Sequence, residues 1–320
     1  MTQSIVELRS AVRPLLEKLS AGDRILVAVS GGADSLALAG ALLAEAKEFL
    51  VTCIGVTIDH QLQDGSDIQA RKVVNQLERI GYSEVVSQRV TVDQSSGLES
   101  GARDARYAAL HSIAKERGAI QIFLGHTRDD QAESVLLGLA RGSGARSLSG
   151  MATVNGKIIR PFLSVTREVT EQACKDFGLD AWSDPHNFNA EFSRVRVRTQ
   201  VLPMMEKEIG PGIAEALART ASLLRDDADA LDELTDHSAQ GHDLASLEIE
   251  FLADLPKAIR TRLIRMAIYA QGAPMGSVTA DHVSAVEALV TSWHGQGEIS
   301  LPGGVKVARI SGRLSAYARS

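Results

Sequence analysis

The first 140 residues alternate between short apolar runs and longer segments whose apolar positions follow helical spacing. The run Ile25 to Val29 is short and continuous, which is typical of a strand buried on both faces. Residues 66–81 instead carry apolar side chains at helical spacing and end at Gly81, a common residue after a helix. The same criteria predict strands at 25–29, 51–58, 84–90 and 120–124, and helices at 35–47, 66–81, 98–117 and 128–140.

Strands that alternate with helices of this length indicate a doubly wound α/β fold built on a parallel sheet. In such sheets, ligands bind at the carboxyl ends of the strands. The candidate site therefore lies in the loops that begin at residues 30, 59, 91 and 125.

Beyond residue 200 the pattern changes. Residues 211–236 open with Pro-Gly and have an acidic outer face, which predicts a long helix leading away from the first domain. Two further helices, near 258–269 and 279–290, and three short β-like runs near the C-terminus predict a small α+β domain. We therefore expect a first domain at 1–210, a connecting helix and linker at 211–240, and a small domain at 241–320.

Composition narrows the class of protein. The 320 residues include 34 Lys and Arg against 40 Asp and Glu, a formal charge of -6, which excludes a uniformly basic nucleic-acid coat but not a local basic face. The two cysteines, Cys53 and Cys174, form neither a disulfide scaffold nor a CxxC pair. The N-terminus has no signal-peptide pattern, and polar residues interrupt the longest weakly charged stretch, so we expect no membrane partner and a cytoplasmic location.

The loop after the first predicted strand combines glycines, hydroxyls and a carboxylate directly before a helix. It consists of Ser30, Gly31, Gly32, Ala33, Asp34 and Ser35. Glycines let the backbone approach a ligand, and the free N–H groups of a helix N-terminus attract phosphate. Asp34 would repel a bare phosphate, so it favours a Mg²⁺ ion between the carboxylate and phosphate oxygens. A tight strand-to-helix turn capped by Ser or Asp is the alternative, and no Walker A pattern occurs.

A second polar segment follows the strand that ends at Leu124. Asp130 and Glu133 are three residues apart and share one face of the predicted helix. The expected buried stripe of this helix consists of Ala132, Val135, Leu136 and Leu139. Two carboxylates near a strand end can hold an ammonium group or accept its proton. The alternative is an acidic first helical turn that complements the helix dipole.

Two arginines, Arg103 and Arg106, stand at i and i+3 on the helix before that strand, followed by Tyr107. A guanidinium group suits phosphate because its planar fork makes two parallel hydrogen bonds and stays charged. The alternative is that both arginines are solvated or pair with Glu99 and Asp104.

In combination these segments resemble the tRNA(Ile)-lysidine synthetase family, within the PP-loop or N-type ATP pyrophosphatase superfamily. The SGGADS loop carries the superfamily pattern, and four further motifs make the resemblance specific from about residue 22 to about residue 205. These motifs are Ala102-Arg103 with Arg106-Tyr107; His126 with Asp129 to Glu133, continuing through Leu139 to Gly144 and Leu148, Gly150 and Met151; a predicted strand at Arg160-Pro161-Phe162-Leu163; and Asp184 to Asn187 with Phe192, Arg194, Arg196, Arg198 and Leu202-Pro203.

The resemblance implies the PP-loop ATP pyrophosphatase fold and an ATP-dependent ligase with Mg²⁺ as a further cofactor. The enzyme would join free L-lysine to carbon 2 of the wobble cytidine of tRNA(Ile) with a CAU anticodon, through an adenylated cytidine, releasing AMP and pyrophosphate. Ser30 to Ser35 would bind ATP, with Asp34 as the metal partner, and Arg106 would neutralise developing phosphate charge. Asp130 and Glu133 would bind the lysine ammonium and help to remove its proton.

Further contacts to the nucleotide or substrate are expected from residues near the strand ends and on the preceding helix. These candidates are Asp59, His60, Arg103 and His126. A lone histidine is more often structural, so the roles of the two histidines stay open.

Because the chain is acidic overall, positive charge for tRNA has to be local. The expected tRNA-binding residues are Arg141 and Arg146 beside a Gly-Ser loop, the alternating Arg194, Arg196 and Arg198, and Lys306, Arg309 and Arg313 in a C-terminal segment, 299–320, without acids. We expect the small domain to contact tRNA outside the anticodon. Balance by neighbouring acids is the alternative, above all for 194–198, and a homodimer is kept as an open partner hypothesis.

Three rival functions fit parts of the pattern. A PP-loop tRNA thiolase would need cysteines to carry sulfur or a cluster, and the two present lack CxxC spacing. A ligase acting on a small metabolite would leave the arginine-rich loops without purpose. A nucleotide-binding regulatory module would keep the loop but would not need the acidic pair.

Overall fold

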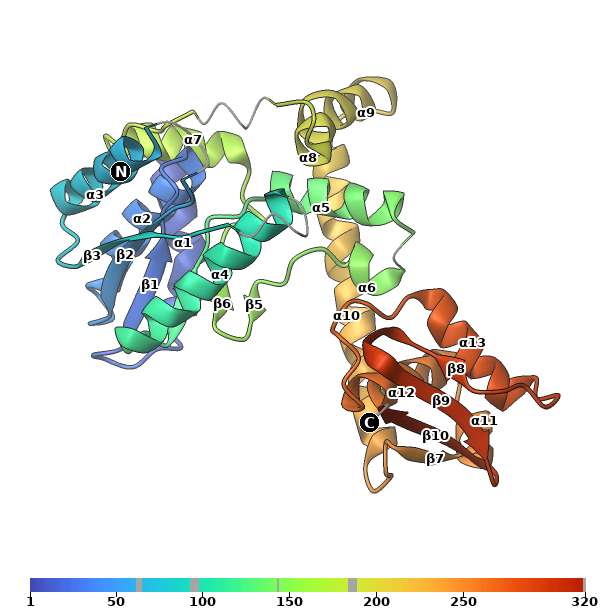
Figure 1. The fold of residues 1–320 in the computed structure, drawn as a ribbon. Helices are drawn as coiled ribbons and strands as arrows, with labels where there is room; N and C mark the ends of the chain where they lie inside the picture. The colour runs from blue at the N-terminus through green and yellow to red at the C-terminus, as the bar shows by residue number, and fades with distance from the viewer. Residues whose placement is uncertain (62–64, 93–97, 143, 184–188, 319–320) are drawn as a thin grey trace. The chain divides into compact units, whose positions relative to one another are not determined.

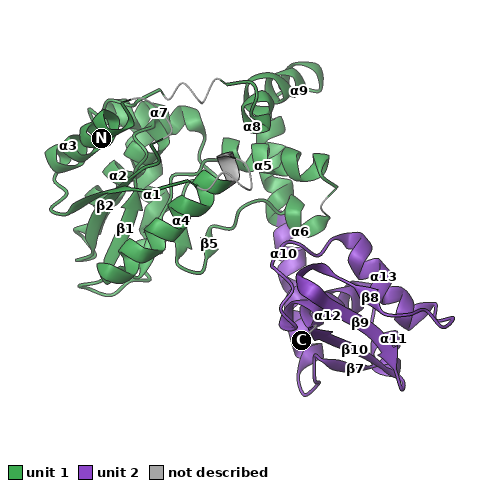
Figure 2. Ribbon diagram, in the orientation of Figure 1, with its two compact units in different colours: residues 1–222 green, residues 223–320 purple. Residues whose placement is uncertain are grey.

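The computed structural model describes residues 1–61, 65–92, 98–142, 144–183 and 189–318. By the density of its internal contacts the chain divides into two compact units, residues 1–222 and residues 223–320 (Figure 2). The boundary between them lies within one long helix, α10 (Ile213–Ala239). Each unit is described by itself.

The first unit is built on a six-stranded sheet in the order β3-β2-β1-β4-β6-β5 (Figure 1). Its strands are β1 (Arg24–Ala28), β2 (Thr52–Asp59), β3 (Val85–Arg89), β4 (Gln121–Phe123), β5 (Val154–Asn155) and β6 (Ile158–Ile159). Strands β3, β2, β1, β4 and β6 are parallel, and β5 pairs antiparallel with β6. The four predicted strands and the parallel sheet are confirmed.

Helices cover both faces of this sheet. The helices of this unit are α1 (Gln3–Leu16), α2 (Ala33–Ala46), α3 (Ser66–Ile80), α4 (Leu98–Glu116), α5 (Arg128–Ala140), α6 (Ala145–Leu148), α7 (Arg167–Asp176), α8 (Ser193–Arg196), the π-helical turn η2 (Val197–Val201), α9 (Leu202–Glu208) and the first part of α10. One apolar core joins α1, α2, α3 and α7 to one face, and a second joins α4 to the other. The doubly wound architecture is therefore confirmed.

The sheet order places the candidate site. Strand β1 lies between β2 and β4, so the chain leaves β1 and β4 at the point where the strand order reverses, which is where α/β sheets bind ligands. Gly125, after β4, lies against the first turn of α2, because a Cβ atom there would be 2.8 Å from the carbonyl oxygen of Asp34. The absence of a side chain thus lets the loops after β1 and β4 meet.

Three details differ from the sequence-based expectation. The predicted strand at 160–163 is wrong: β6 ends at Ile159, and the chain turns at Pro161, which has no N–H to continue a ladder. Leu139 was expected in the buried stripe of α5 but is 61% exposed, whereas Glu133 is fully buried. Helix α1 was not predicted at all.

The second unit is a small α+β fold. It contains β7 (Ser246–Glu248), α11 (Ile249–Asp254), α12 (Lys257–Ala270), α13 (Ala280–Thr291), β8 (Ile299–Ser300), a 3-10 turn η3 (Pro302–Gly304), β9 (Val305–Ile310) and β10 (Arg313–Ala318). The strands form an antiparallel sheet in the order β7-β10-β9-β8, whose apolar face packs on the helices. The two predicted helices and three β runs are confirmed, while β7 and α11 were missed. Across the described residues, no helix is long and apolar enough to cross a membrane.

Candidate active site

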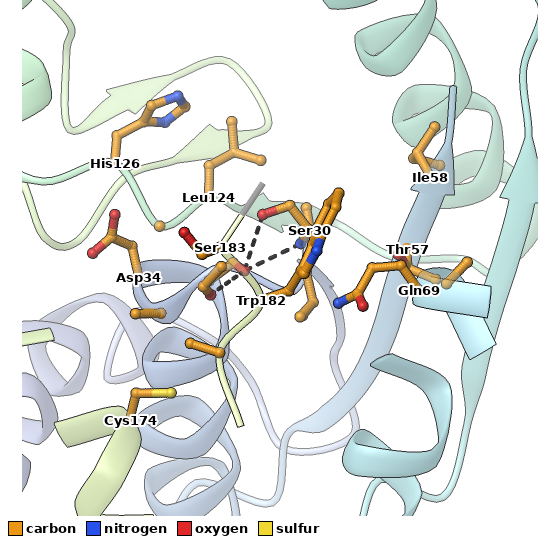
Figure 3. A pocket seen from close by; sticks show the side chains of 18 of the residues that line it. Ser30, Asp34, Thr57, Ile58, Gln69, Leu124, His126, Cys174, Trp182 and Ser183 are labelled. Atoms are coloured by element: carbon orange, nitrogen blue, oxygen red, sulfur yellow. Dashed lines mark hydrogen bonds between the residues drawn. The ribbon is translucent and has the colours of Figure 1, made fainter. Parts of the chain in front are cut away.

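A cavity of about 1020 Å³ opens at the carboxyl ends of β1, β2 and β4 (Figure 3). Residues from the loops that begin at 30, 59 and 125 all line it, as the strand order predicts. Most of the fourth predicted loop, after β3, falls outside the described residues. Asp34 and His126 lie at one side of the lining, and Thr57, Ile58 and Gln69 lie at the other (Figure 3). Asp130 also lines the cavity.

The loop of residues 30–35 is held in shape by its own hydroxyl groups. The Ser30 N–H donates to Oγ of Ser35 at 3.1 Å, and that hydroxyl donates to the Gly32 carbonyl oxygen at 2.9 Å (Figure 3). Gly31 has φ of +92°, a conformation that a residue with a side chain adopts only under strain. Helix α2 begins at once at Ala33, and its first residues line the cavity. The first N–H groups of a helix have no partner within it, which favours an anion at such a position.

A segment far along the chain crosses over this loop. Residues 178–183 are fixed by Gln76 of α3, whose side chain bonds the backbone N and O of Asp180 at 2.7 and 3.1 Å. The N–H of Trp182 then donates to the Gly31 carbonyl oxygen at 2.8 Å, and its indole lines the cavity (Figure 3). The sequence analysis missed Trp182, since no local pattern links it to the loop.

Asp34 is the carboxylate of the loop, and two groups from α7 contact it. The Thr170 hydroxyl donates to one carboxylate oxygen, and Nε of Arg167 lies 3.6 Å from the other. Burial raises the pKa of Asp34 to about 6, although Thr170 and Arg167 both act to lower it. The carboxylate is therefore held in a position where its charge is only partly compensated.

The acidic pair, Asp130 and Glu133, lies in the first turns of α5. Asp130 closes a capping box with Thr127, because its Oδ2 accepts the Thr127 N–H at 2.8 Å. The alternative of an acid serving the helix start is thus confirmed for Asp130, which nevertheless also lines the cavity. Glu133 is fully buried and is not among the residues that line the cavity.

Three arginines surround the acidic pair. Nη2 of Arg167 donates to Oδ1 of Asp130 at 3.0 Å. Arg194 and Arg198 bond Glu133 through their Nε atoms at 2.8 and 2.6 Å and approach Asp130 at 3.8 and 3.4 Å. These contacts place two of the expected tRNA-binding arginines against buried carboxylates, which is the alternative considered for 194–198. The result is a cluster of charges of both signs beside the loop of residues 30–35.

The electrostatics of the cluster fix two protonation states. Burial acts to raise the pKa of Asp130, but Arg167 and other positive neighbours outweigh it, so the pKa stays below its usual range. Burial also lowers the pKa of His126 to about 3, so this cavity-lining imidazole is neutral at physiological pH. His60 lines the cavity too, and burial lowers its pKa. Nδ1 of each histidine is buried without a hydrogen-bond partner among the described residues.

The remaining predicted contacts to nucleotide or substrate differ in whether they line the cavity. Arg106 and Asp59 line the cavity, whereas Arg103 does not. Arg103 contacts Tyr107 and makes no ion pair with Asp104 among the described residues; the side chain of Glu99 is not described.

The arginines expected near the Gly-Ser loop are on the surface. Arg141, just after α5, and Arg146, in α6, are both exposed. Arg196 is exposed as well, but its Nη1 bonds the carbonyl oxygens of Ala190 and Glu191 at 2.7 and 2.8 Å. The motif at 184–187 lies outside the described residues.

The C-terminal basic segment is partly neutralised by acids that precede it. Lys306 pairs with Glu298, and Arg313 pairs with Glu248 at 2.8 Å. The expectation that no acid balances this segment is therefore wrong for these two residues, since antiparallel pairing brings acids from neighbouring strands and loops alongside.

Arg309 differs from its neighbours on the sheet. Its guanidinium lies 5.4 Å from the ring centroid of Trp293, and Nη1 donates to the Leu289 carbonyl oxygen at 3.2 Å. Among the described residues it pairs with no carboxylate. A cation stacked on an exposed aromatic ring is a surface that suits nucleic acid.

Comparison with known proteins agrees with this geometry. A PP-loop domain model matches residues 4–205, which defines the class of the first unit as a PP-loop ATP-using domain. A U34-tRNA thiolase from Methanococcus maripaludis, solved with its 4Fe-4S cluster, shares the fold with a TM-score of 0.59 and 20% identity, covering 69% of this chain and 80% of that chain. The TilS substrate binding domain model matches residues 247–315.

Close relatives resolve the family. A tRNA(Ile)-lysidine synthase from Thermobifida fusca is 51% identical over 308 residues, covering 96% of this chain and 95% of the relative. One from Streptomyces coelicolor is 52% identical over 295 residues, covering 91% and 84%. The chain belongs to the tRNA(Ile)-lysidine synthase family.

Proposed function

We propose that this chain uses ATP to join L-lysine to carbon 2 of the wobble cytidine of tRNA(Ile) with a CAU anticodon. One observation carries the proposal: a single cavity combines a phosphate-type loop with a cluster of acids and arginines suited to an amino acid, in a chain that matches its family almost end to end. The cytidine O2 attacks the ATP α-phosphate and pyrophosphate leaves. The lysine ε-amine then attacks carbon 2, and AMP leaves.

The loop of residues 30–35 is our proposed site for the ATP phosphates. It offers the N–H groups at the start of α2, the hydroxyls of Ser30 and Ser35, and a glycine backbone that a phosphate can approach closely. Arg106 lines the same cavity and brings a positive charge to bear on the phosphate where negative charge develops.

Asp34 is our proposed protein partner of Mg²⁺. The ion is usually held by one or two carboxylates together with substrate phosphates and water, so a cavity-lining carboxylate within the phosphate loop itself fits it. When bound, Mg²⁺ would neutralise phosphate charge.

Asp130 is our proposed contact for the lysine ammonium. Its lowered pKa keeps it ionised, which suits it to hold an ammonium group and makes it a weak proton acceptor. Arg167 and Arg198 line the cavity beside it and can bind the carboxylate of the amino acid. Glu133 does not reach the cavity; in this proposal it acts by holding Arg194 and Arg198 in position.

The cysteines give no support to sulfur transfer. Cys53 lies in β2 and Cys174 in α7, both buried, and burial raises their pKa values to about 12 and about 11. A thiol that stays protonated is a poor nucleophile.

The proposed function is tested by incubating the purified protein with ATP, Mg²⁺, labelled lysine and a tRNA(Ile) transcript with a CAU anticodon. We expect label to enter the transcript with release of one AMP per lysine. A transcript with uridine at the wobble position serves as the control. ATP turnover without transfer of lysine to RNA would overturn the proposal.

A further inference from the structure

The arginines near the cavity form two groups, which differ in whether carboxylates among the described residues pair with them. Arg167, Arg194 and Arg198 are paired with Asp130 and Glu133. A second group, the Tyr107 cluster, consists of Arg103, Arg106 and Tyr107 from α4 with Arg160 from the turn after β6. In the part of the chain that the structure describes, no carboxylate pairs with any of these three arginines.

The cluster is built around the phenol ring of Tyr107. The Arg103 and Arg106 guanidinium carbons lie 4.9 and 5.6 Å from the ring centroid. The phenol oxygen accepts hydrogen bonds from Nη2 of Arg103 and Nη2 of Arg160, each at 3.3 Å. Because the oxygen accepts from both sides, its own proton remains to be donated, and a phosphate oxygen is a suitable acceptor.

Among the described residues, no acid compensates the charge of the cluster. Arg160 is only 5% exposed, and the Nε atoms of Arg106 and Arg160 are buried without partners among the described residues. Burial, reinforced by Arg103 and Arg194, lowers the pKa of Arg106. Buried positive charge without a counter-charge is costly, and an incoming anion removes that cost.

The position of the cluster distinguishes between two sources of phosphate, a nucleotide in the cavity and the backbone of an RNA strand. Arg106 lines the cavity, but Arg103, Tyr107 and Arg160 do not. Of the cluster, a nucleotide bound in the cavity therefore meets only Arg106. An RNA strand that delivers one base into the cavity has to continue outside it, with its next phosphates near the rim.

We propose that the Tyr107 cluster binds a backbone phosphate of the anticodon loop, adjacent to the nucleoside whose base enters the cavity. This inference rests on the proposed function, because it takes tRNA as the substrate. Arg103, on the exposed side, makes the phosphate contact; Tyr107 orients it and donates its own proton; and Arg160 holds the phenol from the buried side.

The test compares two variants that remove the same charge at opposite ends of one helix, α4. Arg103→Gln removes an arginine of the cluster. Arg117→Gln is the control: it removes an exposed arginine just after the same helix, which pairs with Glu84 at 3.3 Å. Tyr107→Phe keeps the ring and removes only the hydroxyl. Binding of a tRNA(Ile) transcript is measured between 50 and 200 mM salt, roughly the range in which phosphate contacts are revealed, and ATP binding is measured in parallel.

We expect Arg103→Gln to weaken tRNA binding about 5-fold to 10-fold and to reduce the slope of log K against log salt by about 1. Tyr107→Phe should weaken tRNA binding about 3-fold, and Arg117→Gln should match wild type, with ATP affinity and melting temperature unchanged in all three. If both cluster variants bind tRNA as wild type does, the inference is overturned while the proposed function stands. An equal loss of ATP and tRNA binding has the same consequence. Failure of the wild-type chain to bind tRNA overturns the proposed function with it.

Discussion

Replacing Asp34 with asparagine should stabilise the ligand-free protein while it disables the proposed enzyme. Burial in the first turn of α2 raises the pKa of this carboxyl to about 6, against an ordinary value of 3.8. The folded chain therefore binds a proton at Asp34 more tightly than the unfolded chain does, and ionisation costs stability. Asparagine resembles the protonated side chain and does not carry that cost.

The size of the effect follows from the pKa difference. Two pKa units correspond to about 3 kcal/mol. The Asp34 side chain is 26% exposed, so solvent screening reduces the expected gain; about 1–3 kcal/mol is the range we expect. The stability that the proton provides is fully present below about pH 4 and is lost as pH rises through about 6, so the variant's advantage is largest above about pH 7.

Thermal unfolding without nucleotide or Mg²⁺ measures this gain. At pH 8 the melting temperature of Asp34→Asn should exceed that of wild type by about 2–10 °C, and the difference should shrink at pH 5. Asp226→Asn, an exposed carboxylate on α10, is the control and should stay within about 0.5 kcal/mol of wild type. With ATP and Mg²⁺ added, wild type should gain more than the variant, because it alone binds the metal complex fully.

The melting temperatures at pH 8 can refute the proposed cost of ionising Asp34. If Asp34→Asn melts at or below the wild-type temperature at pH 8 while Asp226→Asn melts normally, then the Asp34 carboxylate is not held in the structure at a cost. A gain that is the same at pH 5 and pH 8 would also contradict the argument, since a titrating group cannot produce it.

Four further predictions concern the site and the Arg309 surface. Asp130→Asn should raise the KM for lysine at least tenfold and leave ATP binding intact, and equal losses of both would refute the division of roles. Glu133→Gln should lower the free energy of unfolding by about 3 kcal/mol in chemical denaturation, because it leaves the half-buried Arg194 and Arg198 without their buried carboxylate; a loss below about 1 kcal/mol would contradict this. Gly125→Ala should lower turnover at least tenfold, since its Cβ would lie 2.8 Å from a backbone oxygen of α2, and wild-type kinetics would show that the loops tolerate separation. Arg309→Gln should weaken tRNA binding several-fold with normal ATP binding, as should Trp293→Ala, whereas unchanged tRNA affinity in both would exclude this surface.

Local sequence patterns predicted the positions of the strands and loops. Contacts between residues far apart in the sequence determine which charged groups meet in the site. The loop at 30–35 could be predicted because its glycines, hydroxyls and following helix are contiguous in sequence. The partners of Glu133 could not be predicted in this way, since Arg194 and Arg198 lie 61 and 65 positions away. Trp182 was missed for the same reason: a backbone hydrogen bond to Gly31, across the fold, brings it to the cavity.

The number of acidic and basic residues in a sequence segment does not predict which charges are paired in the fold. The C-terminal segment holds basic residues and no acid, yet Lys306 and Arg313 find carboxylates that precede the segment in the chain. Arg103 and Arg106, by contrast, stand near acids in sequence and pair with none of the described ones. An anion is attracted by charge that the fold leaves unpaired, and local composition does not reveal which charge that is. We therefore expect contacts with RNA around Tyr107 in the first unit and around Arg309 in the second, and not in the segments richest in arginine.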